Sequence, residues 1–71
     1  SPVNHILVEP LSERELQVLR LLAEYLSSTE IAKELFISTN TVRFHIKNIY
    51  DKLDTHTRRE AIQRSKDLGL L

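Results

Sequence analysis

The stretch that decides the fold runs from Phe36 to Tyr50 and reads FISTNTVRFHIKNIY. Ser38 marks a helix start, because a serine hydroxyl placed before an apolar period is a favourable N-cap. Three other starts pair Ser or Thr with a Glu three positions later, so that each residue caps a backbone N–H of the other: Ser12 with Glu15, Ser27 with Glu30, and Thr57 with Glu60. After Ser38 the third position holds Thr41. This helix therefore lacks the acidic half of its cap.

The four caps, together with the helical spacing of apolar residues behind them, predict four helices and no strand. The expected ranges are 13–25, 28–35, 39–53 and 58–68, and the last stops at Gly69, the residue best suited to a left-handed helix end. In the first helix, the apolar stripe comprises Leu16, Leu19, Leu22, Ala23 and Leu26. The sequence predicts an all-α, four-helix domain with a helix-turn-helix motif at about 27–46. This motif consists of a short helix, the three-residue turn 36–38 and a longer helix, and a scaffold helix precedes it.

Length and composition narrow the classes of protein. The 71 residues suffice for one small core and leave no room for a deep substrate pocket, so we do not expect an enzyme. There is no cysteine and no converging set of nucleophile, acid and base, so we expect neither a metal nor a cofactor. Both prolines lie in residues 1–10, which read as a linker or flexible arm before a domain at 11–71. No apolar run approaches the roughly 20 residues that span a bilayer, and we expect a cytoplasmic, nucleoid-associated protein.

The formal net charge of zero hides an asymmetry along the chain. Residues 1–40 contain three basic and six acidic residues, whereas residues 41–66 contain seven basic and three acidic residues. A basic second half points weakly to an anionic partner such as nucleic acid.

The faces of the predicted helix 39–53 follow from its advance of about 100° per residue. Its apolar stripe, which we expect to be buried, comprises Val42, Ile46, Ile49 and Leu53. The opposite, exposed stripe comprises Asn40, Arg43, Phe44, Lys47 and Asp51. His45 and Tyr50 fall on the two edges, where partial burial against the rim of the core is the expected role.

Phe44 points away from the predicted core between two basic side chains. One interpretation is contact with a thymine methyl in the major groove, with Arg43 and Lys47 reaching guanine acceptors or phosphates. The other is docking against a further domain of a longer parent chain. The missing glutamate bears on this choice, because a helix N-terminus favours a phosphate and a carboxylate there would repel it. Together these features favour the helix that begins at Ser38 as the one that enters DNA.

These residues resemble the LuxR-type (GerE-type) helix-turn-helix domain. The resemblance covers Leu11 to Leu71 and is carried by Leu-Ser-x-Arg-Glu at 11–15, Glu-Ile-Ala at 30–32, and Thr-Val-x-x-His at 41–45 with its continuation to Leu53. The chain looks most like the C-terminal domains of MalT-like, ATP-dependent regulators. The resemblance implies the output domain of a bacterial transcription regulator with an upstream sensor or ATPase domain.

The resemblance also implies roles for particular residues. The recognition helix, 39–53, would lie in the major groove, with Arg43, Phe44 and Lys47 reading bases. Contacts to the DNA backbone would come from Thr29, Thr39, Asn40, Thr41 and Lys52. The fourth helix would form a weak homodimer on paired half-sites through Ile62, Ser65 and Lys66, in a patch centred on Ser65.

Four positions depart from the family pattern. The family usually has glycine where this chain has Tyr25, a basic residue where it has Thr29, and Gly-Val where it has Asp54-Thr55. We expect one weaker phosphate contact at Thr29. We also expect the turn at Asp54 to survive with some loss of stability, because Asp tolerates the left-handed conformation better than most residues.

The alternative class is a protein-interaction module that displays Phe44 and Tyr50 to RNA polymerase or to another domain of its parent chain. The dependence of affinity on salt separates the two classes, because only phosphate neutralisation makes affinity fall steeply with salt.

Overall fold

The computed structural model describes residues 10–71, and these form four helices and no strand. The helices are α2 (Glu13–Ala23), α3 (Ser28–Leu35), α4 (Thr39–Leu53) and α5 (Arg58–Asp67). The predicted all-α class is therefore confirmed. Of the predicted arm 1–10, all but Pro10 lies outside the described residues. Between residues 10 and 71, no helix has the length and apolar character needed to cross a membrane.

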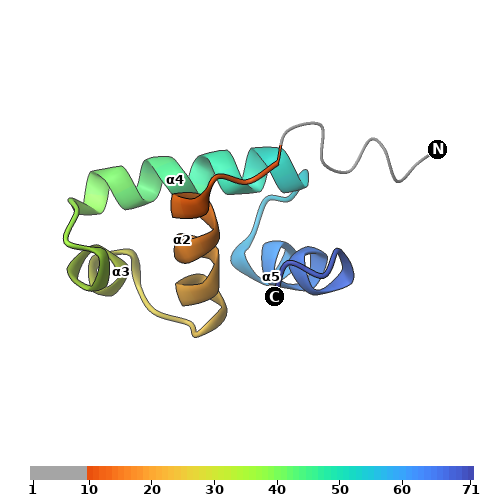
Figure 1. The fold of residues 1–71 in the computed structure, drawn as a ribbon, viewed down its shortest axis with the longest axis horizontal. Coiled ribbons are helices and arrows are strands. Elements are labelled where there is room, and N and C mark those ends of the chain that lie inside the picture. Colours follow the sequence, from red (N-terminus) through yellow and green to blue (C-terminus); the bar gives the residue numbers. More distant parts are fainter. Residues whose placement is uncertain (1–9) are drawn as a thin grey trace.

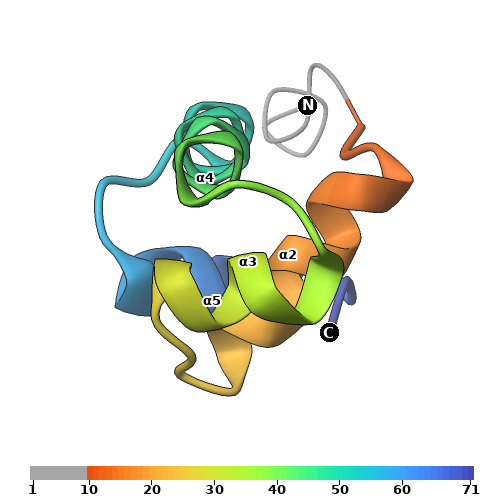
Figure 2. The ribbon, with the colours of Figure 1, turned by 90° about the vertical axis from the view of Figure 1, so that its left-hand side faces the viewer.

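The longest helix, α4, lies across the other three (Figure 1). It packs against α2, α3 and α5, which form a layer on one side of it (Figure 2). Within this layer α3 lies near the N-terminal half of α4, α5 near its C-terminal end, and α2 between them. Among residues 10–71, no helix covers the opposite face of α4.

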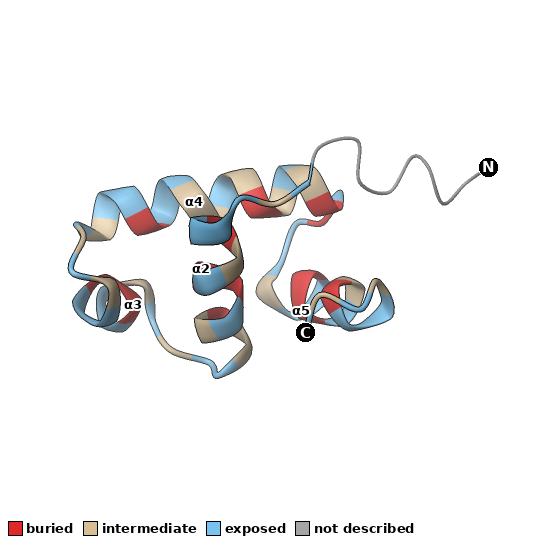
Figure 3. Cartoon of the chain, viewed as in Figure 1, coloured by how far each residue is buried: buried red, intermediate tan, exposed pale blue. Residues whose placement is uncertain are grey.

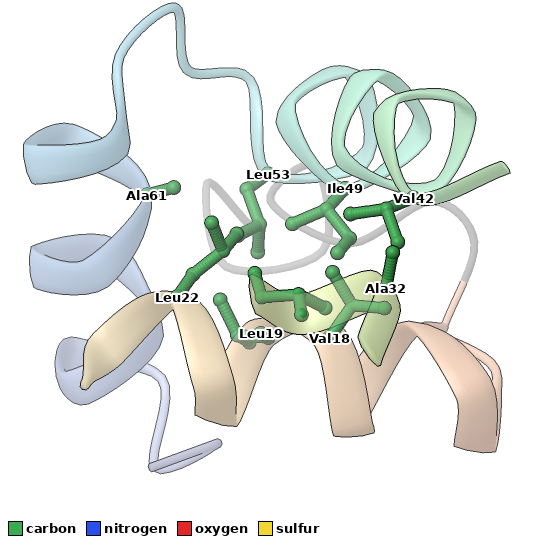
Figure 4. Packing of buried hydrophobic residues seen from close by; sticks show 9 residues of the cluster. Val18, Leu19, Leu22, Ala32, Val42, Ile49, Leu53 and Ala61 are labelled. Carbon is green, nitrogen blue, oxygen red and sulfur yellow. The ribbon is translucent and has the colours of Figure 1, made fainter. Parts of the chain in front are cut away.

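The core forms where α4 crosses α2. Figure 4 shows the apolar side chains of α4 facing those of α2, with Ala32 of α3 and Ala61 of α5 at the sides. The residues of this core with no exposed surface include Val18, Leu19, Leu22, Ile31, Val42, Ile49 and Leu53. The predicted apolar stripe of α4 is thus buried at three positions, while Ile46 is half-buried against the core rim.

Along α2 the buried surface is wider than predicted. Leu19 and Leu22 are fully buried as expected, but Leu16 is half-buried and Val18, which was not predicted, has no exposed surface. The physical reason is position, because α2 is covered by α3, α4 and α5 and so buries more than one stripe.

All four helices start at the predicted caps. Ser12 and Ser27 form complete capping boxes with Glu15 and Glu30. At the start of α5, Thr57 Oγ1 accepts from the Glu60 N–H at 3.1 Å, while Glu60 Oε1 accepts from the His56 N–H. In the fourth capping box, Glu60 thus accepts from the residue before the N-cap, His56, and not from the N-cap Thr57 as the pattern predicts.

The four helix ends share one motif. Each is followed by a residue with positive φ, namely Tyr25 (64°), Phe36 (57°), Asp54 (55°) and Gly69 (75°). The next residue in each case donates its N–H to a carbonyl five positions back, at 2.8–3.3 Å. This bond satisfies a carbonyl that the helix leaves unpaired. Asp54 and Gly69 are left-handed, as predicted, whereas the helix expected to reach Tyr25 ends at Ala23 because the chain turns left-handed at Tyr25.

Candidate nucleic-acid interface

The face of α4 opposite α2, α3 and α5 carries the predicted base-reading residues. Arg43, Phe44 and Lys47 are all exposed, and Phe44 keeps 61% of its surface accessible. Figure 3 shows this outer face of α4 in the colours of exposed and intermediate residues. The Phe44 ring, with a cation on each side, projects from a helix of 15 residues whose other side packs into the core.

One acidic residue lies on the same face. Lys47 Nζ is 3.4 Å from Asp51 Oδ2, one turn toward the C-terminus. Both side chains are largely exposed, 74% and 66%, so the pair contributes little and is screened by salt. The Lys47 ammonium is therefore free to exchange Asp51 for another anion.

The N-terminus of α4 carries the hydroxyls of Ser38, Thr39 and Thr41 and no carboxylate in its first turn. Ser38 Oγ accepts from the Thr41 N–H at 3.0 Å and lies 2.8 Å from Thr41 Oγ1. A hydroxyl has a single hydrogen, so whichever of the two donates, the other hydroxyl hydrogen stays available. The helix end thus combines its partial positive charge with one spare O–H donor.

A shallow groove of about 310 Å³ runs beside α4, between this helix and the turn before α5. Its lining residues are Arg43, Ile46, Lys47, Tyr50, Asp51, Thr55 and His56. His45 and Tyr50 are half-buried, as predicted for the edges of the helix. Burial raises the pKa of the Tyr50 phenol, against the opposing influence of the nearby Arg58 guanidinium. Tyr50 is therefore a neutral wall of the groove.

Thr39 and Asn40 begin α4, and Thr29 is the second residue of α3. Asn40, Thr41 and Thr29 are exposed, whereas Thr39 is half-buried. Apart from Lys52, four residues are predicted to contact the DNA backbone, and three of them thus present their side chains to solvent.

Lys52 lies apart from these residues, at the C-terminal end of α4. Its ammonium donates to Glu15 Oε1 at 2.8 Å and to the Pro10 carbonyl at 3.3 Å. The Lys52 side chain is only 20% exposed. The position predicted as a DNA-backbone contact is therefore occupied by intramolecular partners.

On α5, the structure corrects the predicted centre of the dimer patch. Ser65 has no exposed surface, and its hydroxyl donates to the Ala61 carbonyl; Ile62 is 5% exposed. Neither side chain can meet a second copy while the fold is intact, because both face the core. Lys66 is exposed, as are Arg59, Glu60, Gln63 and Asp67. Any contact through this helix would be made by polar side chains.

Besides Ser65, two further buried polar residues were not predicted. The Glu15 carboxylate, which the capping pattern placed at a surface helix start, is 5% exposed. Thr55 is 8% exposed, and its Oγ1 has no hydrogen-bond partner among residues 10–71. The family pattern, with valine at the position of Thr55, was the sequence signal for burial there.

The chain matches the family model described as bacterial regulatory proteins, luxR family, over residues 9–65. Among curated proteins it is 48% identical to the transcriptional regulatory protein DesR of Bacillus subtilis over 60 residues, covering 84% of this chain and 30% of DesR. It is 39% identical to the HTH-type transcriptional regulator MalT of Vibrio cholerae, covering 93% of this chain and 8% of MalT. The chain thus spans less than a third of the length of either relative.

Solved structures give the same assignment. The response regulator ChrA of a haem-sensing two-component system superposes with a TM-score of 0.85 at 38% identity, covering 89% of this chain and 31% of ChrA. The transcription factor GerE superposes with a TM-score of 0.80 at 39% identity, covering 86% of this chain and 91% of GerE. The chain therefore belongs to the luxR family of bacterial regulatory proteins, as a DNA-binding helix-turn-helix domain of the kind found in transcription regulators.

Proposed function

We propose that this domain binds double-stranded DNA sequence-specifically, with α4 in the major groove, as the output domain of a bacterial transcription regulator. The observation that carries the proposal is the bare face of α4, on which Arg43, Phe44 and Lys47 are exposed together. Guanidinium and ammonium groups suit the guanine acceptors of the major groove, and an apolar ring suits the thymine methyl.

The start of α4 supports a phosphate contact in the same pose. The first turn has no acidic residue, and one hydroxyl hydrogen of the Ser38–Thr41 pair is spare. A phosphate at this helix end would meet free N–H groups, a hydroxyl and a favourable dipole. Asn40 and Thr41 are exposed beside it, and Thr29 offers a hydroxyl from the start of α3. We assign these three residues, with Thr39, to the DNA backbone.

Dimerisation on paired half-sites is part of the proposal, with weak pairing in solution. The exposed side chains of α5 are polar or charged, including Lys66. Such a surface buries little apolar area, and a stable dimer usually needs more. Pairing would then depend on the two half-sites that bring the copies together.

Selection of bound duplexes from a random pool tests the proposal. An enriched half-site, repeated at a constant spacing, is the expected result, with affinity that falls steeply as salt rises. If no duplex is enriched, or if the affinity does not change with salt concentration, the proposal is wrong. The alternative would then be favoured, in which Phe44 docks on RNA polymerase or on another domain of the parent chain. Sedimentation without DNA is expected to give a monomer.

A further inference from the structure

Lys52 joins three parts of the chain that are distant in sequence. It lies one residue before the end of α4. Its ammonium contacts Glu15 in the first turn of α2 and the carbonyl of Pro10, where the chain enters the domain. These contacts span 37 and 42 residues of sequence.

The acceptor is an unusual carboxylate for a helix cap. Glu15 Oε1 accepts both from the Ser12 N–H at 2.9 Å and from Lys52 Nζ at 2.8 Å, and its side chain is only 6% exposed. The comparable Glu30 accepts from Ser27 in an exposed capping box. A buried carboxylate without a partner would be strongly destabilising, so Lys52 is the partner that the burial of Glu15 requires.

The titration of Glu15 agrees with this geometry. Burial acts to raise the pKa of the Glu15 carboxyl, but the hydrogen bonds from Lys52 and from the Ser12 N–H outweigh it and hold the pKa below its ordinary value. The Glu15 carboxyl is therefore ionised at neutral pH, and its negative charge faces the Lys52 ammonium at 2.8 Å.

We propose that Lys52 is a positioning residue rather than a phosphate contact: it holds the C-terminal end of α4 on α2 and so sets the angle at which Arg43, Phe44 and Lys47 are presented. The apolar core beneath α4 resists separation of the helices, but side-chain packing alone allows small rotations of one helix over another. A directed ion pair at one end of α4 restricts that rotation. This inference rests on the proposed DNA-binding function of α4.

The experiment compares Lys52→Met and Glu15→Gln with Lys47→Met. Lys52→Met keeps the aliphatic stem, Glu15→Gln keeps an oxygen acceptor for the cap, and Lys47→Met removes a lysine that we assign to DNA from the same helix. Affinity is measured against salt for the duplex recovered by selection and for a mixed-sequence duplex, at a temperature where each variant is folded. Glu15→Gln carries the test if Lys52→Met does not fold.

We expect Lys52→Met and Glu15→Gln to lower the ratio of specific to mixed-sequence affinity by about threefold or more, without changing the slope of affinity against salt. Lys47→Met is expected to lower that ratio, because a base contact is lost, and also to reduce the slope by about one, because a cation that enters the charged groove is lost. A slope reduced by about one in Lys52→Met would make Lys52 a phosphate contact and overturn the inference. A ratio that stays constant in both variants would also overturn it.

A measurement without DNA separates this inference from the proposed function. Amide hydrogen exchange at Ser12 and at the last turn of α4 is expected to speed up in both variants, because the ion pair between these segments is lost. Unchanged exchange at both segments would show that Lys52 does not hold α4, whatever the DNA result. If selection enriches no duplex, the proposed function fails, while the exchange measurement still tests the anchor.

Discussion

The N-terminal and C-terminal ends of α4 belong to one helix and meet different surroundings. At the N-terminal end, Ser38 and Thr41 form an exposed cap and Arg43 and Phe44 project into solvent. At the C-terminal end Leu53 is fully buried, and its carbonyl accepts from Arg64 Nε of α5 at 3.1 Å. The C-terminal end of α4 is therefore fixed to the rest of the domain, whereas the N-terminal end presents its side chains to solvent. Substitutions at the two ends should therefore affect different measurements.

Leu53→Ala should have the largest effect. Removal of a fully buried leucine leaves a cavity where α4 meets α2 and α5, and should lower the free energy of unfolding by about 2–5 kcal/mol. Urea denaturation measures the change. Phe44→Ala on the exposed face is the control and should stay within about 0.5 kcal/mol. Similar losses in both variants would contradict the division between the two ends.

Arg43→Ala changes the exposed N-terminal half of α4. It should weaken binding to the selected duplex by about 1–3 kcal/mol, with a smaller loss on mixed-sequence DNA, because a base contact is lost. Lys47→Ala should behave similarly. Fluorescence anisotropy titrations on both duplexes measure the effect, with Arg59→Ala on α5 as a control for a lost surface charge. Equal losses on both duplexes would take Arg43 out of base readout.

Thr55→Val lies just beyond the buried C-terminal end of α4 and should increase stability. The buried Thr55 hydroxyl has no partner within residues 10–71, and valine has the same shape without that polar group. Thermal unfolding should show a gain of about 1 kcal/mol. Thr55→Ser is the matched variant: it keeps the hydroxyl and loses a methyl, so it should be less stable than the parent. A loss in Thr55→Val would mean that the hydroxyl is satisfied in solution.

Thr41→Glu tests the open cap. A glutamate at this position completes a capping box and places a negative charge at the expected phosphate site, so affinity for every duplex should fall by about 0.3–1 kcal/mol. Thr41→Gln supplies a similar cap without the charge and should bind more tightly than Thr41→Glu. Helix content is followed by circular dichroism. Undiminished binding of Thr41→Glu would refute a phosphate contact at this cap.

Acidification should produce the smallest effect, confined to low pH. The pKa of Glu15 is lower in the folded state than its ordinary value, so its stabilising contribution is complete above the unfolded pKa, about 4.3, and is lost as the pH falls through the folded pKa. Glu15→Gln should therefore make the decline in unfolding free energy below about pH 5 shallower. Glu30→Gln, at an exposed cap, should change that decline less. An identical decline in the parent and in Glu15→Gln would contradict the pairing with Lys52.

Local chemistry explains why the helix starts and the faces of α4 could be predicted. A cap depends on residues three positions apart, and a helical face depends on residues three or four apart, so both patterns are visible in the sequence. Ser12, Ser27, Ser38 and Thr57 accordingly cap helices, and Arg43, Phe44 and Lys47 are exposed.

Features that depend on distant parts of the chain escaped prediction. Val18 is buried because α2 has neighbours on several sides, and Ser65 is buried because α5 turns that face toward the core. Lys52 reads as a free cation in the sequence, yet its partners lie 37 and 42 residues away. The end of α2 before Tyr25 escaped prediction for another reason, since tyrosine does not favour the left-handed conformation that the turn imposes. The end of α3 at Leu35 was predicted, but the left-handed conformation of Phe36 was not.

The sequence by itself determined the four capped helices, the motif that joins α3 to α4, and the absence of an acidic residue in the first turn of α4, because each depends on near neighbours along the chain. The tertiary structure decided which cations are available. It leaves the ammonium of Lys47 exposed beside Asp51 and encloses that of Lys52 between Glu15 and Pro10. Two lysines of one helix differ in this way because burial and charge pairing depend on what the fold brings against each side chain.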